Sequence, residues 1–192
     1  MKPGIHRLVI APLVALTLVL PGCGTIPGED AQQQAITIDD LVEKTLIDLE
    51  RDHPESKDEV AKSAGYVIMS NKLTKIPLVG AGAGYGVGIE TATGEKTYLR
   101  MRRVDFGLGV GARAVRPVLI FQDAKKFHEY IDGKFGASIG AEASAKAGES
   151  GSAGGGEASR GEGYTSYLIT DSGVSATASL AVVRVKRVKL KS

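Results

Sequence analysis

The sequence is poor in the residue types that most often carry chemistry. It has one cysteine, three histidines and no tryptophan, and aromatic residues make up only 5% of it. A single cysteine excludes an internal disulfide framework. Bases and acids nearly balance, at 24 against 22, so the whole molecule has no electrostatic bias toward nucleic acid. The sequence lacks GxxxxGK[ST], HExxH and CxxC, which are common signs of nucleotide and metal enzymes.

Two short patterns suggest catalysis or metal binding, and neither is complete. Residues Gly136–Gly140 fit GxSxG, the pattern of a hydrolase nucleophile elbow, which needs a following helix and a later histidine. No histidine follows His128. His128 and Asp132 stand four residues apart on an expected helix and supply at most half of a metal site. We therefore predict that the protein is not an enzyme and has no catalytic residues, metal site or cofactor.

Glycine is abundant, at 25 of 192 residues, and in one stretch it is strictly ordered. Residues 78–90 read LVGAGAGYGVGIE, with glycine at every second position. That is the side-chain period of a β-strand, so one face of this strand would be bare backbone. Such a strand is weak by itself, and we expect it to bend or to have another element packed closely on its glycine face. The glycines given this structural role are Gly80, Gly82, Gly84, Gly86 and Gly88, with a second set at Gly107, Gly109 and Gly111.

The first 22 residues have the organisation of a signal peptide. Lys2 and Arg7 precede an apolar run, Leu8–Leu20, that is too short to span a bilayer as a helix. The run ends in Leu-Pro-Gly-Cys, which resembles a bacterial lipobox. On that basis we expect Cys23 to be acylated and to anchor the chain in a membrane, because several acyl chains give stable attachment. An ordinary signal peptide with an incidental cysteine is the alternative.

The residues after the anchor point bear on location. Gly24 follows the cysteine, and the resemblance to lipoprotein sorting signals then implies the outer membrane, with the domain facing the periplasm. Residues 23–36 contain proline, glycine and three glutamines, and they are expected to form a tether. The domain itself would span residues 37–192.

Hydrophobic periodicity and turn residues predict an α+β fold for this domain. The expected helices run from Thr37, as N-cap, to His53, from Glu55 to Ser63, and from Asp123, as N-cap, to Ile131. The expected strands are Gly65–Ser70, Leu78–Glu90, Lys96–Arg103, Phe106–Ala112, Val118–Phe121 and Phe135–Ala147, with a final hairpin of Tyr164–Thr170 and Gly173–Leu190. Residues 71–77 would be a connector, Arg116-Pro117 a break or an edge of the sheet, and 148–163 a flexible loop. The sum is a glycine-rich antiparallel sheet, curved or barrel-like, with N-terminal helices and one mid-chain helix.

The last expected strand ends in several basic residues, with no acidic residue among them. The candidates for contact with anionic lipid headgroups are Arg184, Lys186, Arg187 and Lys189, joined by Lys72, Lys75, Arg100, Arg102 and Arg103. Each such base near a membrane contributes about 1 kcal/mol. An edge strand protected from aggregation by lysine is the alternative. Nucleic acid is disfavoured as a partner because no stacking aromatics accompany the charges.

From about Ala61 to Leu190 the chain resembles the SYLF domain family. The matching stretches are Ala61–Ile68 (AKSAGYVI), the glycine run Gly82–Gly88, Phe106–Gly111 (FGLGVG), Phe135–Gly148 (FGASIGAEASAKAG) and Gly173–Ala176 (GVSA). The resemblance implies a lipid-binding module, since eukaryotic members bind phosphoinositides and some bind actin. Bacterial members are typically secreted or acylated.

Two functions follow as hypotheses. The first is an acyl-anchored envelope lipoprotein whose domain binds phospholipid, with anionic headgroups as the preferred ligand. The second is a non-catalytic structural or assembly lipoprotein of the outer membrane, in which the glycine strands pack chains together into an oligomer.

Overall fold

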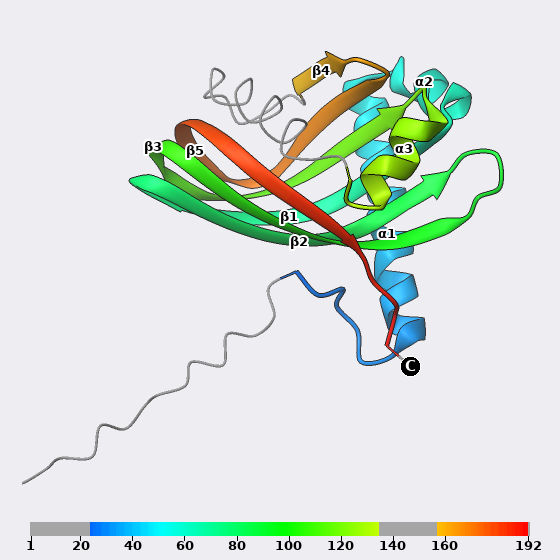
Figure 1. Cartoon of the computed structure of the whole chain (residues 1–192), viewed down its shortest axis with the longest axis horizontal. Coiled ribbons are helices and arrows are strands. Elements are labelled where there is room, and N and C mark those ends of the chain that lie inside the picture. Colours follow the sequence, from blue (N-terminus) through cyan, green and yellow to red (C-terminus); the bar gives the residue numbers. More distant parts are fainter. Residues whose placement is uncertain (1–23, 135–156, 192) are drawn as a thin grey trace, which may run out of the picture.

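The computed structural model describes residues 24–134 and 157–191 (Figure 1). Its helices are α1 (Ala31–Asp52), α2 (Ser56–Lys62) and α3 (Ala124–Ile131). Its strands are β1 (Gly65–Ile76), β2 (Leu78–Glu90), β3 (Lys96–Phe121), β4 (Glu157–Gly161) and β5 (Tyr164–Arg187). The predicted α+β class with a curved antiparallel sheet is confirmed, and the sheet is open rather than closed into a barrel. The described helices and strands lie between Ala31 and Arg187.

The sheet is organised around β3, which pairs with three other strands. In the described residues the order is β1-β2-β3-β5-β4, and all pairings are antiparallel. The first half of β3 pairs with β2 as far as Gly107, and its second half pairs with β1 from Gly111 onward. The second glycine set therefore lies where β3 leaves one strand of the β1–β2 hairpin and joins the other. Glycine is the residue usually found at such sharp bends of a sheet.

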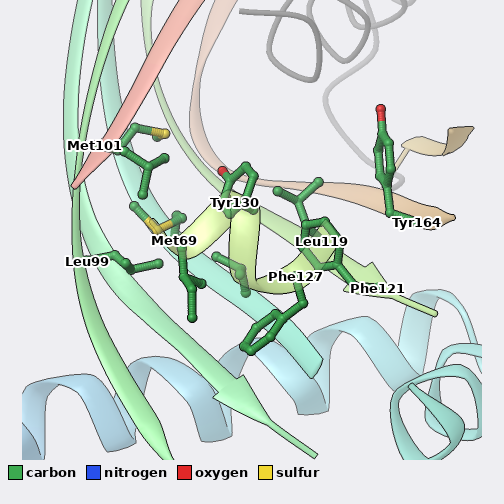
Figure 2. Close-up of a cluster of buried hydrophobic side chains, with 11 residues drawn as sticks. Met69, Leu99, Met101, Leu119, Phe121, Phe127, Tyr130 and Tyr164 are labelled. Carbon is green, nitrogen blue, oxygen red and sulfur yellow. The ribbon is translucent and has the colours of Figure 1, made fainter. Parts of the chain in front are cut away.

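Helices cover both faces of the sheet. The inner face carries α3, whose Phe127, Tyr130 and Ile131 pack on Met69, Leu99 and Met101, among others (Figure 2). The strands curve around this cluster. The outer face carries α1, whose Ile38 and Leu49 are fully buried against strand residues including Ile68, Val87, Ile89, Val118 and Ile120. These two helices fix which side of each strand is inner and which is outer.

The glycine face of β2 is the inner face, and other groups approach it closely. A Cβ atom on Gly84 or Gly86 would overlap a backbone carbonyl oxygen of β1, from Ser70 or Ile68 respectively. A Cβ atom on Gly88 would lie 2.7 Å from Cγ2 of Ile131 in α3. The close approach expected from the sequence is therefore made by the neighbouring strand and by α3.

The prediction that residues 23–36 form a tether is wrong from Gly24 onward. Helix α1 begins at Ala31, and the carboxylate of Asp30 caps it by accepting from the Gln33 amide at 2.8 Å. Thr37, predicted as the cap, lies inside the helix and donates to the Gln33 carbonyl at 3.0 Å. Before the helix, Ile26 is buried in the cluster that contains Ile38 and Val87. Burial of this apolar side chain holds the segment on the domain.

Three predicted interruptions of strands are also wrong. β1 continues through the expected connector to Ile76, β3 continues through Arg116-Pro117, and β5 continues through the expected turn at residues 171–173. In each case pairing with a neighbouring strand supplies the hydrogen bonds that the local sequence does not favour. The proline still has a local effect, because β1 pairs with β3 at Val115 and Val118 but not between them.

The short helix predicted at Glu55–Ser63 and the mid-chain helix capped by Asp123 are confirmed as α2 and α3. Part of the predicted loop 148–163 is instead strand β4, which pairs with β5. The predicted strand Phe135–Ala147, the GxSxG pattern at 136–140 and the first part of that loop lie outside the described residues.

Arg116 joins α1 to the sheet. Its side chain is only 4% exposed, and it donates to Thr45 of α1 at 3.0 Å, to Asp48 of α1 at 2.5 Å and to Asp171 of β5 at 2.8 Å. The hydrogen bond from Arg116 holds the pKa of Asp48 below its ordinary value. This arginine lies at the position where the sequence predicts a break in the strand.

Replacing Arg116 by glutamine should lower the stability of the folded protein at neutral pH. The stability of the variant should also change less than that of the wild-type protein as the pH falls. The wild-type gains stability from Asp48 above the ordinary aspartate pKa of about 3.9, and loses it as pH falls through the lowered folded value. The difference in melting temperature between wild-type and Arg116→Gln should therefore narrow below about pH 4. Lys57→Gln is the control, because that lysine pairs with Glu50 but is 70% exposed. A gap that stays constant down to about pH 2 would contradict this role for Asp48.

Candidate functional site: a basic hollow on the outer face

Four bases surround a hollow on the part of the outer face that α1 leaves uncovered. Arg100 and Arg102 come from β3, and Lys186 and Arg184 lie directly opposite them on β5. The hollow has a volume of about 250 Å³, and these four residues line it. Alternate residues of a strand share a face, so the sequence places each pair on one side, and the register of β3 with β5 brings the pairs together.

The charge of the hollow is uncompensated. No carboxylate of the described residues forms an ion pair with any of the four bases, and none lines the hollow. The Nε atom of Arg100 is buried and has no hydrogen-bond partner in the described part of the chain. A buried donor without a partner is costly, and like charges placed close together repel. An anion in the hollow would relieve the repulsion between the four bases, and arginine binds phosphate and carboxylate groups with two parallel hydrogen bonds.

Gly24, the residue after the predicted anchor, lies against the same row of the sheet. Lys72 of β1, Ala83 of β2, Arg102 of β3 and Arg184 of β5 are successive cross-strand partners. A Cβ atom on Gly24 would lie 3.2 Å from Cβ of Ala83, so the start of the described chain rests on this row. Cys23 itself lies outside the described residues, but its peptide bond to Gly24 leaves from this point.

The other predicted bases lie elsewhere. Arg187 is on the inner side, where it pairs with Asp132 at the end of α3 at 2.6 Å. Arg103 also faces inward and forms a buried pair with Asp105. Lys189 is exposed beyond the end of β5, and the side chain of Lys75 lies outside the described residues. The structure thus joins Arg184 and Lys186 to Arg100 and Arg102, aligns Lys72 with them, and separates Arg187.

Sequence reasoning missed an apolar group next to the hollow. Large apolar side chains are exposed at one end of the sheet, where β1 turns into β2 and β3 runs alongside. They are Ile76, Leu78, Val79, Val104, Phe106 and Val110. The sequence gives no sign of this group, because its members lie in three segments that only the pairing of β1, β2 and β3 brings together.

The remaining candidates are weaker. His128 faces Glu90, with Nε2 at 3.6 Å from a carboxylate oxygen, whereas Asp132 pairs with Arg187. No group of residues suited to a metal ion occurs in residues 24–134 and 157–191. A second hollow beside β4 has walls of both charge signs, and its groups pair with one another, as Arg160 does with Glu59. It therefore lacks the surplus charge of the outer-face hollow.

Comparison with known proteins adds little to this geometry. No family model matches the chain. The chain is similar to Beta cell expansion factor A of Aeromonas veronii, with 25% identity over 101 residues. The match covers 53% of this chain and 38% of that protein, so the chain spans well under half the length of this relative. Among the described residues, no helix is both long and apolar enough to cross a membrane.

Proposed function

We propose that the protein is a bacterial envelope lipoprotein, anchored through acylated Cys23, whose SYLF-like domain binds anionic phospholipid headgroups. The basic hollow on the outer face carries the proposal. It collects four bases that no described carboxylate neutralises, and a phosphodiester has the charge and the acceptor oxygens to satisfy them. The lipobox-like signal and Gly24 support a location at the outer membrane, with the domain on its periplasmic side, as part of this proposal. No enzymatic step and no cofactor is part of this proposal.

The position of Gly24, the residue after the predicted anchor, supports the same proposal. Gly24 rests on the row that contains Lys72, Arg102 and Arg184, so acyl chains on the preceding residue would hold these bases at a membrane surface. Bases close to a membrane are attracted by its negative surface potential, which falls off within about 10 Å. Attachment at this row therefore keeps the hollow within the range of that potential.

Vesicle binding by residues 24–192 tests the proposal. The double variant Arg102→Gln/Arg184→Gln should bind phosphatidylglycerol vesicles about 30-fold more weakly than wild-type, since each base contributes about 1 kcal/mol. The matched control is Lys44→Gln/Lys125→Gln, which removes the same charge from exposed positions on α1 and α3. Sedimentation with vesicles of graded lipid composition gives both affinities. Equal binding to phosphatidylcholine and phosphatidylglycerol, or equal weakening in the control, would sink the proposal.

A structural or assembly role is the second candidate, and the exposed apolar side chains favour it. Large apolar groups at one end of the sheet are a common mark of contact between protein chains. In that case residues 24–192 should form oligomers in a concentration-dependent way. Light scattering that shows a monomer over a wide range of concentration would count heavily against this role.

A further inference from the structure

The apolar tip is the group Ile76, Leu78, Val79, Val104, Phe106 and Val110. We propose that the apolar tip inserts into the acyl region of the membrane whose headgroups the basic hollow contacts. The inference rests on the proposed function and extends it, because it fixes the orientation of the domain on the bilayer. Eight large apolar side chains are strongly exposed in the described residues, and six of them form this group. The other two, Ile36 and Ile47, lie on α1.

Four residues of the tip form one surface. Val79 is the cross-strand partner of both Ile76 on β1 and Phe106 on β3, so these three side chains stand side by side on the outer face. Val104 precedes Phe106 by two residues on the same face of β3. Their exposed fractions run from 41% for Val104 to 64% for Ile76. An apolar surface of this kind has no role in the core of this chain and fits an apolar environment outside it.

Leu78 is the sharpest sign of an external contact. It stands with Pro77 in the two-residue turn between β1 and β2, and its φ is +77°. That conformation is unfavourable for leucine, and glycine is the usual residue after proline in such a turn. The leucine side chain is nevertheless 61% exposed, so folding gains little from it. A strained residue with no gain in packing points to a function, and an exposed leucine at a turn suits the interior of a bilayer.

The order of residues along β3 matches the layers of a membrane. Arg102 lines the hollow, Val104 follows it, and Phe106 follows next, all on the outer face. Since a strand rises about 3.4 Å per residue, Phe106 lies roughly 14 Å beyond Arg102 along the strand. The headgroup layer on each side of a bilayer is about 5 to 8 Å thick. Bases at the phosphates would thus put the end of the hairpin below the headgroups, in the depth range of interfacial segments.

The lack of tryptophan makes the insertion measurable. Phe106→Trp and the control Ile47→Trp each introduce a single fluorophore at an exposed apolar position, one on the tip and one on α1. Residues 24–192 of each variant are mixed with phosphatidylglycerol vesicles whose acyl chains carry bromine. We expect a blue shift and strong quenching for Phe106→Trp, and neither for Ile47→Trp. Protein that sediments with the vesicles but shows equal quenching at both positions would overturn the insertion and leave headgroup binding intact. Failure to sediment would overturn the proposed function and the insertion with it.

Leu78→Gly separates insertion from folding. Glycine accepts the positive φ, so the melting temperature should stay the same or rise. Affinity for phosphatidylglycerol vesicles should fall about tenfold or more, because the leucine no longer enters the bilayer. Unchanged affinity in a folded Leu78→Gly protein would overturn the proposal. So would loss of an oligomer in this variant with no change in vesicle binding, because the tip would then serve contact between chains.

Discussion

Replacing Gly84 by leucine should destabilise the domain by more than about 3 kcal/mol or prevent it from folding. The reason is a clash with the backbone of the neighbouring strand, which cannot be relieved by a change of side-chain rotamer. A Cβ atom at this position would overlap the carbonyl oxygen of Ser70, and Cα of Asn71 would lie 3.1 Å away. Both groups belong to β1, which pairs with β2 along all twelve of its residues and also pairs with β3. Relief of the overlap would need β1 to move away from both partners.

The matched control is Ala81→Leu. This residue is on the same strand, on the outer face, and it is exposed. The enlarged side chain should therefore change the free energy of unfolding by no more than about 0.5 kcal/mol. Urea denaturation followed by circular dichroism compares the two variants directly. Similar midpoints for Gly84→Leu and wild-type would mean that the glycine face is open and that the glycines have another purpose.

Replacing Arg103 by methionine should lower stability by about 3 to 5 kcal/mol. Arg103 holds Asp105 through Nε at 3.0 Å and Nη2 at 2.6 Å, and the aspartate side chain is 0% exposed. Taking a carboxylate out of water is costly unless a cation compensates it. The variant would leave this carboxylate in the interior without its arginine. Asp105 must then either stay charged without a partner or take up a proton, and both cost free energy.

Two further variants isolate that cause. The double variant Arg103→Met/Asp105→Leu removes both charges, and it should regain most of the lost stability, since apolar replacements of buried pairs are often neutral or better. Arg102→Met changes the adjacent residue, which is exposed and lines the basic hollow, so the free energy of unfolding should be unchanged or slightly higher. Denaturant midpoints of the wild-type protein and of these three variants allow the comparison. If the double variant is as unstable as Arg103→Met, the introduced methionine causes the loss of stability, and the unpaired carboxylate does not.

The sequence predicts local features of this fold well. The glycine-rich strand at 78–90 coincides with β2, because a strict period of two admits no helical interpretation. The caps also follow local rules, as Asp123 shows, and the Asp30 cap could have been recognised from Gln33 three residues later. That signal was outweighed by the proline and glycines just before it. Errors of this kind come from choosing between two local signals that compete.

The long strands could not be predicted in the same way. Polar residues at 71–75, the proline in β3 and the aspartate and glycine in β5 each favour a turn locally. In the folded chain these segments gain backbone hydrogen bonds from partners far away in the sequence, such as Gly111 for residue 75. No property of the segment itself reports that such a partner exists, so propensity alone places breaks where the sheet continues.

The same distinction between local and long-range properties applies to the candidate site. The sequence by itself determined that basic residues alternate on the last strand, that arginines occur at 100 and 102, and that glycines leave one face of β2 bare. Only the tertiary structure decided that Arg100 and Arg102 meet Arg184 and Lys186 while Arg187 pairs with Asp132. Strand periodicity is a local property, set by backbone geometry, whereas the register between two strands depends on the whole sheet. The same register put Ile76, Val79 and Phe106 in one row, and made an exposed surface of residues that had no visible connection in the sequence.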